Sequence, residues 1–296
     1  MTDDKAADFD LFPKLYHGAN FLSFPIAMVI LEIDAPVELI WCGDTPDKVV
    51  AFTHHNSFLN LNLFQTIPVL EEKDKTTTIE PCAIMMSILE RYDTTHYKLH
   101  PKPSSVRERA NFLQLLFFSV REVYRHGLIF KFFSTPKLME WGCLHWENFN
   151  VEVNEDSHRV AVERWETKIG PTLLIWFGEG PMFFSSRRPT AADFMLMKGL
   201  SYFESLLHGK YESLGKYLAL LQNRRSFLES SVHPDYFGGT PREVVSAAAV
   251  AAKPTSTTVT PKQRKPLHSP KIVASKYLVT AADEAEKRNG KSKEDA

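Results

Sequence analysis

The sequence predicts an α/β domain, then an all-helical domain, then a polar C-terminal tail. Up to about residue 97, short apolar segments with strand-like and helix-like patterns alternate along the chain, which favours helices packed on a sheet. From residue 106 the apolar residues recur at helical spacing only. After residue 238 proline, threonine, serine and lysine dominate, and such a segment is too polar to bury a core. The expected bounds are 13–97, 104–232 and, for the disordered basic tail, 239–296.

The first half of the α/β domain contains a strand, a helix and a second strand. Residues 14–18 (Lys-Leu-Tyr-His-Gly) form a short apolar run that ends in glycine. Residues 23–33 carry isoleucine and valine at helical spacing, with Ser23 near the start and Pro25 in the first turn. Residues 37–41 predict the next strand, and residues 44–62 have a weak helical pattern.

The second half contains a strand that begins near Pro68 and a helix over residues 80–92. Proline cannot donate a hydrogen bond to a sheet, so Pro68 marks the start of a strand or a bend. The apolar pairs of residues 80–92 recur at helical intervals behind the acidic Glu80.

Two long helical patterns and one helix-capping pair organise the all-helical domain. The prolines of residues 98–105 indicate a linker between the domains. Helices are expected over residues 106–133 and 160–177, with a break or kink at Gly170 and Pro171 in the second. Thr190 and Asp193 have the spacing of a capping pair before an apolar run, and residues 211–227 predict a closing helix.

Composition and charge are those of an ordinary soluble protein. The 296 residues are 44% hydrophobic and 24% charged, with a formal net charge of -1. Residues 239–296 hold eleven basic and six acidic side chains, a net charge of +5, which leaves -6 for the rest. The tail is therefore a candidate arm for protein partners. Its basic run at residues 262–265 is too short to predict binding to a nucleic acid.

Three observations favour a cytoplasmic location. The three cysteines, Cys42, Cys82 and Cys143, are far apart, which indicates a reducing compartment without a disulfide framework. The first twelve residues have no apolar run, so a secretory signal is not expected. No stretch approaches the 18 apolar residues of a membrane span. No metal is predicted either, because the adjacent His54 and His55 have no third ligand at useful spacing.

Residues 62–92 resemble the glutathione-binding half of the cytosolic glutathione transferases. The family pattern is Asn-Pro-x-Gly-Lys-Val-Pro-x-Leu, followed by a hairpin and Glu-Ser-x-Ala-Ile at the start of a helix. The matching positions in this chain are Asn62, Ile67, Pro68, Leu70, Glu80, Ala83, Ile84, Leu89 and Tyr92. The Gly-Lys pair is replaced by Gln65 and Thr66, and the serine after the acid by Pro81. With the capping pair and closing helix, the resemblance covers about residues 13–232 and implies a thioredoxin-like domain followed by an all-α domain.

The resemblance implies a catalytic serine. Residues 21–25, Phe-Leu-Ser-Phe-Pro, are similar to the Leu-Ser-x-Pro signature of the theta and delta classes, in which the serine hydrogen-bonds the glutathione sulfur. A hydrogen bond to a charged group contributes roughly 1.5 to 3 kcal/mol, enough to lower the pKa of a thiol towards neutrality. The alternative is that Ser23 only caps its helix. Tyr16 is interpreted as a packing residue, with a tyrosine-type catalytic role as the less favoured hypothesis.

The resemblance also implies where glutathione binds. Ile67 is expected to pair with the cysteinyl main chain beside a cis Pro68, and the helix start at Glu80 to hold the γ-glutamyl end. Pro81 has neither a hydroxyl nor an N–H, so one or two such hydrogen bonds are lost. The residues expected to contact glutathione are His54, Thr66, Ile67, Pro68, Glu80 and Pro81, although the favoured interpretation of His54 is a solvated loop residue.

The implied activity is conjugation of glutathione, the co-substrate, to a hydrophobic electrophile. Phe117, Phe118, Tyr124 and the aromatic residues 141–146 are candidates to line the electrophile's pocket, or else they belong to the core. The family habit also implies a homodimer. A non-catalytic scaffold of the same fold is the alternative, which Pro81 and the altered Gln65–Thr66 pair favour and the intact Leu-Ser-x-Pro segment opposes.

Overall fold

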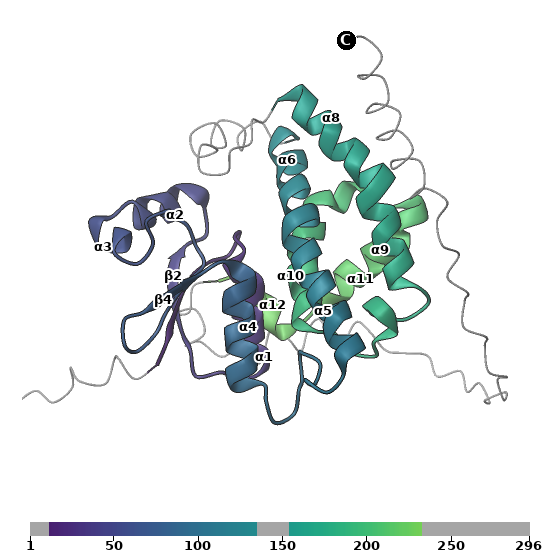
Figure 1. Ribbon diagram of the computed structural model, residues 1–296. Helices are drawn as coiled ribbons and strands as arrows, with labels where there is room; N and C mark the ends of the chain where they lie inside the picture. Colours follow the sequence, from purple (N-terminus) through teal and green to yellow (C-terminus); the bar gives the residue numbers. More distant parts are fainter. Residues whose placement is uncertain (1–11, 135–153, 233–296) are drawn as a thin grey trace, which may run out of the picture. The chain divides into compact units, whose positions relative to one another are not determined.

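The computed structural model describes residues 12–134 and 154–232 (Figure 1). These residues lie in one compact unit. The tail predicted over residues 239–296 and the aromatic residues 141–146 lie outside the described residues. The domain bounds expected from the sequence stay a prediction.

A four-stranded sheet in the order β2-β1-β3-β4 forms the α/β layer. The first two strands run parallel, and β3 is antiparallel to both of its neighbours. The elements of this layer are β1 (Lys14–Gly18), α1 (Ser23–Glu32), β2 (Glu38–Gly43), α2 (Pro46–Thr53), α3 (Asn56–Leu59), β3 (Val69–Glu71), β4 (Thr77–Ile79) and α4 (Pro81–Tyr92). The predicted strands and helices of this region are confirmed, and the weak pattern of residues 44–62 becomes two short helices.

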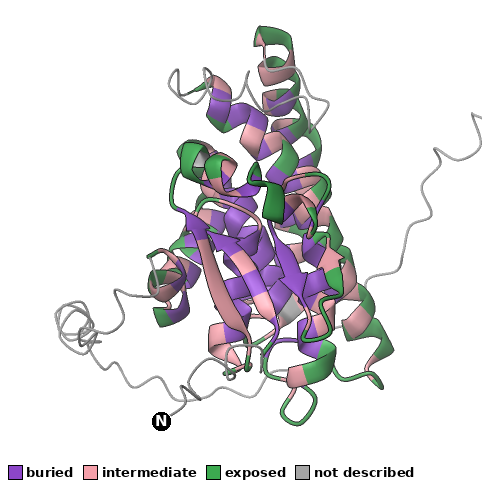
Figure 2. Ribbon diagram, turned by 90° about the vertical axis from the view of Figure 1, so that its left-hand side faces the viewer, coloured by how far each residue is buried: buried purple, intermediate pink, exposed green. Residues whose placement is uncertain are grey.

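The two faces of the sheet bury different cores because side chains alternate along a strand. Leu15 of β1 and its partner Leu70 of β3 belong to the large core with α1 and α4. Tyr16 and its partner Val69 face the smaller core beneath α2 and α3. Figure 2 shows buried residues along the strands and behind them. The sheet therefore lies between α1 and α4 on one side and α2 and α3 on the other.

The all-helical part is built around a long rod that contains a π-helical turn. Helix α5 (Val106–Phe118), the π-helix η1 (Ser119–Tyr124) and α6 (Arg125–Phe133) follow one another without a break. The other elements are α8 (Glu155–Arg164), the π-helix η3 (Trp165–Ile169), α9 (Gly170–Phe177), η4 (Phe183–Ser185), α10 (Ala191–Leu200), η5 (Ser201–Leu206), η6 (Gly209–Tyr211), α11 (Glu212–Gln222) and α12 (Arg225–Ser230). No helix among the described residues is long and apolar enough to cross a membrane.

The sequence predicted a break or a kink at Gly170 and Pro171, and the break does not occur. The helical segment continues through both residues, and the π-helix η3 ends directly before Gly170. Proline cannot donate to the carbonyl four residues earlier in an α-helix, and a π-helical turn changes this hydrogen-bond pattern. The chain accommodates the proline by a change of helix type.

Two glycines let α10 approach the rod closely. A Cβ atom on Gly199 of α10 would lie 2.9 Å from the main-chain nitrogen of Tyr124. A Cβ atom on Gly127 of α6 would lie 3.0 Å from the carbonyl oxygen of Gly199. Real Cβ atoms do not approach backbone atoms as closely as the contact at Gly199, and the contact at Gly127 would be tighter than most, so this separation of the helices requires glycine at Gly199 and favours it at Gly127. The contact determines where the rod lies relative to the sheet, because α10 also packs on α1.

The capping pair predicted at the start of α10 is confirmed. The Asp193 carboxylate accepts hydrogen bonds from the main-chain N–H and the hydroxyl of Thr190, at 2.7 and 2.6 Å. The hydroxyl of Tyr217 in α11 donates to the same carboxylate at 2.7 Å. Burial raises the pKa of Asp193, and the three hydrogen bonds offset part of that cost.

The closing helix predicted over residues 211–227 is divided, with α11 ending at Gln222 and α12 beginning at Arg225. Polar contacts tie α12 back to the α/β layer. Arg224 pairs with Glu32 at the end of α1 through two hydrogen bonds of 2.7 Å, and Ser226 donates to the same carboxylate. At the other end of α12, the carbonyl of Ser230 lies 3.0 Å from His17 Nε2. A carbonyl only accepts, so Nε2 carries the proton and Nδ1 of the neutral ring is an acceptor.

Burial of His17 predicts a loss of stability in acid. Desolvation, with a smaller contribution from the positive charge of Lys198, outweighs the hydrogen bond to Ser230 and lowers the pKa of His17 from 6.5 to about 4. Below pH 6.5 His17 is therefore protonated in the unfolded chain but remains neutral in the folded chain. The free energy of unfolding decreases as the pH falls from 6.5 towards 4. Between pH 6.5 and pH 5, we expect the free energy of unfolding of the wild-type protein to fall by about 1.5 kcal/mol more than that of His17→Gln.

Urea unfolding at several pH values measures this difference. His17→Gln is the matched variant because its side-chain amide keeps a donor for the Ser230 carbonyl and does not titrate. Equal slopes of stability against pH in the two proteins would contradict the expectation.

Candidate functional site

One pocket of about 490 Å³ lies between the α/β layer and the helical rod. The α/β layer contributes three segments, which are the end of the β1–α1 turn, the loop before β3, and the junction of β4 with α4. The rod contributes η1 and the start of α6. The lining residues are Phe21, Leu22, Phe64, Thr66, Ile67, Pro68, Ile79, Glu80, Pro81, Val120, Arg121, Tyr124, Arg125 and Leu128.

The loop before β3 is shaped by the buried side chain of Asn62. Its amide donates to the carbonyl and the hydroxyl of Thr66, at 2.8 and 3.1 Å, and its Oδ1 accepts from the N–H of Phe64 at 3.0 Å. These bonds close the loop over residues 62–66, so that Thr66 and Ile67 line the pocket. The peptide bond between Ile67 and Pro68 is cis, as the resemblance implied.

Gln65 in this loop adopts a backbone conformation that favours glycine. Its φ is 53°, and it occupies the glycine position of the family pattern. An L-residue in this region costs roughly 1 to 2 kcal/mol. The loop thus holds Gln65 in a backbone conformation that favours glycine. We infer that the hydrogen bonds of Asn62 offset the free-energy cost of this conformation.

The junction of β4 with α4 forms the second part of the α/β wall. Glu80 has φ 77° and ψ 117°, a strained conformation of the kind found at functional sites. Pro81 is the first residue of α4 and is buried. The main-chain N–H groups of the first helical turn have no partner within the helix, except that Ile84 donates to the Glu80 carbonyl at 3.0 Å. Proline removes one of these donors, and those of Cys82 and Ala83 remain.

Ser23 does not line the pocket. Its side chain is fully buried, accepts the N–H of Gly18 at 3.0 Å, and lies 3.2 Å from both the Gly18 carbonyl and His17 Nδ1. The hydroxyl proton therefore goes to one of these two acceptors. Ser23 does not cap α1 either, because Leu22 holds the cap position and Ser23 is the first helical residue. The capping interpretation is wrong, and the catalytic role stays a prediction.

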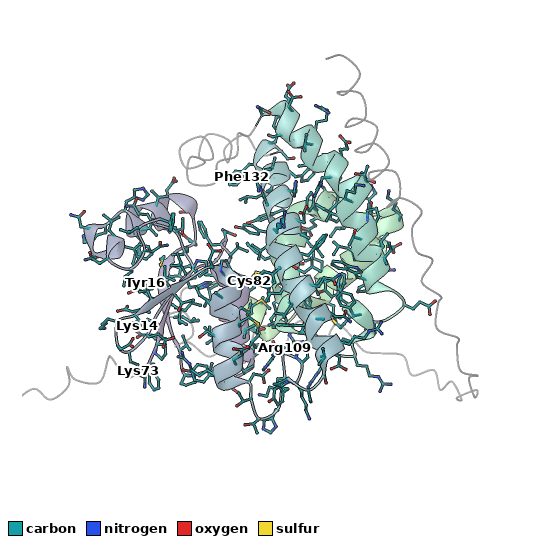
Figure 3. The ribbon with its side chains drawn as sticks, in the orientation of Figure 1. Lys14, Tyr16, Lys73, Cys82, Arg109 and Phe132 are labelled. Carbon is teal, nitrogen blue, oxygen red and sulfur yellow. The ribbon has the colours of Figure 1, made fainter. Side chains whose placement is uncertain are left out.

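His54 and Tyr16 also lie away from the pocket lining. His54 ends α2, and its Nδ1 lies 3.0 Å from the Val50 carbonyl. The hydroxyl of Tyr16 donates to Glu71 at 2.8 Å, and its ring packs on Phe52 and Phe58. Burial, with the neighbouring Glu71 carboxylate, raises the pKa of Tyr16 far above its usual value. Tyr16, labelled in Figure 3, is a packing residue as interpreted from the sequence.

The helical wall combines apolar surface with two arginines. Val120, Tyr124 and Leu128 recur every four residues and form an apolar strip, and Arg121 and Arg125 lie one position further along the chain. Tyr124 is buried against Tyr202, with ring centroids 5.4 Å apart. Burial raises the pKa of Tyr124 to about 12, so the phenol stays protonated at neutral pH. It can donate a hydrogen bond but does not act as a base.

The structure brings together five of the predicted site residues, Thr66, Ile67, Pro68, Glu80 and Pro81, and leaves Ser23 and His54 outside the pocket lining. Of the aromatic candidates among the described residues, Tyr124 lines the pocket and Phe117 and Phe118 do not. Phe118 packs on Trp176 with a centroid distance of 4.9 Å, and Phe117 is 55% exposed. The sequence analysis missed Arg121 and Arg125. The four-residue spacing of Val120, Tyr124 and Leu128 on a predicted helix is the signal that could have found this wall.

No group of His, Cys, Asp or Glu side chains that could hold a metal ion occurs within the described ranges. Cys42 and Cys82 are both buried free thiols, and burial raises the pKa of each to about 12. Cys82 lies where α4 meets the rod (Figure 3), with its sulfur 3.9 Å from the Leu116 carbonyl. Neither thiol has the low pKa of a nucleophile.

The fold is that of the glutathione transferases. It is similar to a glutathione transferase from Methylococcus capsulatus, with a TM-score of 0.57 and 21% identity over 74% of this chain and 97% of that one. A glutathione transferase family member from Pseudomonas fluorescens, with two glutathione bound, has a TM-score of 0.59 and 16% identity over 76% and 95% of the two chains.

A homologue from Lodderomyces elongisporus, with two GSH per subunit, has a TM-score of 0.55 and 17% identity over 74% and 97% of the two chains. No protein-family profile and no curated protein sequence matches this chain. Identities this low establish a shared fold.

The hydrogen bonds of Asn62 predict that its loss destabilises the protein. Asn62→Ala leaves the Phe64 N–H and the Thr66 carbonyl without their partner, and Gln65 without its compensation. We expect the free energy of unfolding to fall by about 1 to 3 kcal/mol. Asn60→Ala, a change at an exposed position in the same loop region, is the control and should cost less than about 0.5 kcal/mol. Urea titration measures both, and equal losses would argue against the role given to Asn62.

Proposed function

We propose that this protein binds glutathione in the pocket between the α/β layer and the rod and conjugates it to an electrophile held by the helical wall. The observation that carries the proposal is the meeting of Ile67, cis Pro68 and Glu80 with the apolar strip of Val120, Tyr124 and Leu128 in one pocket. One wall offers main-chain and charged groups to a peptide. The other offers apolar surface to a second substrate.

The α/β wall has the groups that a γ-glutamyl tripeptide requires. The main-chain N–H and C=O of Ile67 have no hydrogen-bond partner within the described ranges, so both are available to the cysteinyl unit of glutathione. The free N–H groups at the start of α4 suit the γ-glutamyl carboxylate, and the Glu80 carboxylate suits the neighbouring ammonium group. The relatives from P. fluorescens and L. elongisporus with the same fold carry bound glutathione, which supports this assignment.

The reaction needs the thiol to be ionised and aimed at the helical wall. Ser23 remains our candidate for the hydrogen bond that stabilises the thiolate. Its hydroxyl has no exposure, so a thiol reaches it only after the turn of Phe21 and Leu22 moves. Holding the thiolate and the electrophile in one pocket then supplies most of the rate, because a bimolecular reaction becomes effectively unimolecular.

A non-catalytic protein of the same fold is the alternative. Two observations favour it, the missing N–H and hydroxyl at Pro81 and the engagement of Ser23 with Gly18 and His17. Each lost charge-assisted hydrogen bond weakens binding about tenfold or more. A homodimer and a cytoplasmic location, both expected from the sequence, stay predictions.

Calorimetric titration with glutathione tests the proposal on the full chain and on Pro81→Ser. We expect the wild-type protein to bind with a dissociation constant in the range of about 0.1 to 10 mM, and Pro81→Ser to bind about tenfold more tightly because it restores an N–H and a hydroxyl. Lack of binding by both proteins would overturn the proposal. Binding by Pro81→Ser alone would favour the non-catalytic alternative.

Ser23→Ala tests the catalytic step. If Ser23 stabilises the thiolate, the variant should lose about tenfold or more in kcat for conjugation while its affinity for glutathione changes less than twofold. A parallel measurement of the unfolding free energy separates this effect from the loss of the Gly18 and His17 hydrogen bonds. Unchanged kcat in a folded Ser23→Ala protein would exclude the catalytic role.

A further inference from the structure

Two arginines stand on the helical wall of the pocket, where the proposed electrophile binds. Arg121 is in η1 and Arg125 is the first residue of α6, and both line the pocket and are exposed. Among the described residues that line the pocket, Glu80 of the α/β wall is the one with a carboxylate. The two walls of the pocket therefore differ in charge.

The positive charge on this wall is not neutralised by neighbouring side chains. Among the described residues Arg125 has no carboxylate partner. The nearest carboxylate to Arg121 is Glu122, with an Nε to Oε1 distance of 3.7 Å, and the Arg121 side chain remains 85% exposed. Glu122 is already bound by Arg164 through two hydrogen bonds of 2.9 and 3.1 Å. Its charge is thus compensated from outside the pocket.

The local helix geometry keeps both arginines on the pocket side. The π-helical hydrogen bonds of Ser119–Tyr124 widen the helix where it passes the pocket. Two like charges four residues apart on a helix repel each other. An anion that contacts both guanidinium groups removes this repulsion, and arginine is well suited to bind a planar carboxylate.

We propose that Arg121 and Arg125 bind a carboxylate on the electrophile, so that the protein prefers electrophiles with an apolar body and an anionic end. This inference rests on the proposed function for the conjugation step and specifies its substrate class. Val120, Tyr124 and Leu128 hold the apolar body, and the two guanidinium groups orient its charged end. Glutathione itself is assigned to the opposite wall, so the arginines act on the second substrate.

A matched pair of electrophiles tests the proposal with the full chain. In 4-chloro-3,5-dinitrobenzoate and 4-chloro-3,5-dinitrobenzamide the glutathione thiolate attacks the carbon that carries chlorine. A C–S bond forms, the C–Cl bond breaks, chloride leaves with the electron pair, and the thiol proton passes to solvent. Only the benzoate carries a negative charge, so the difference between the two reports on charge recognition. Each kcat/KM is divided by the uncatalysed rate constant of the same electrophile.

We expect the normalised kcat/KM of the wild-type protein to favour the benzoate by at least about fivefold, with the preference falling as salt is added. Arg121→Gln and Arg125→Gln should each reduce the preference, and the double variant should abolish it. The kinetics with the benzamide and the KM for glutathione should change less than about twofold. Arg107→Gln, an exposed arginine of α5 outside the pocket lining, is the charge-matched control and should behave as the wild type.

Titration with the two S-aryl glutathione conjugates separates this inference from the conjugation activity. If the carboxylate conjugate binds more tightly than the carboxamide conjugate, and the double variant loses this difference, the anion site is supported. If the protein also has no turnover, only the conjugation proposal fails. Equal binding and equal rates for the two members of the pair overturn the anion site and leave glutathione conjugation standing. The anion-site proposal is also overturned by any of three results. The preference survives in the double variant, the double variant loses affinity for glutathione, or neither conjugate binds.

Discussion

The close approach of α10 to the helical rod at Gly199 and Gly127 is the constraint on which the rest of the structure depends. With no Cβ atom at either position, the two helices come near enough for the main chains to touch. Helix α10 also packs on α1 and is buried throughout. Because α1 follows directly from the first strand, this contact places the rod at a set distance from the sheet. The pocket is the space that remains between η1 and the loops at the end of the sheet.

Two residues with strained backbone conformations lie at the pocket. Gln65, next to the lining residue Thr66, and Glu80, in the lining itself, both have positive φ angles. Each is held by its surroundings, Gln65 by the hydrogen bonds of Asn62 and Glu80 by its place between β4 and α4. Strain of this kind persists only where neighbouring structure enforces it.

The buried side chain of His17 links Ser23, the proposed catalytic residue, to Ser230 of α12. His17 donates to the carbonyl of Ser230 in α12 and lies within hydrogen-bond distance of Ser23 at the start of α1. The ion pair of Arg224 and Glu32 holds α12 at its other end. Any movement that exposes the Ser23 hydroxyl to a thiol therefore also acts on the docking of α12. The hypothesis that Ser23 is catalytic therefore requires that the contact between α1 and α12 can change.

The sequence by itself determined the order and type of most elements, because apolar periodicity and capping residues act locally. The strand near Pro68, the helix after Glu80 and the Thr190–Asp193 pair were predictable on these grounds. The grouping of Thr66, Ile67, Pro68, Glu80 and Pro81 at one site was predicted from the resemblance to the glutathione transferases, not from local pattern. Tertiary structure alone decided which side chains share a space. The burial of Ser23 and the presence of Arg121 and Arg125 in the same pocket lining as Glu80 depend on packing between segments far apart in the chain. Local pattern does not contain that information, because burial and distance arise only when those segments meet.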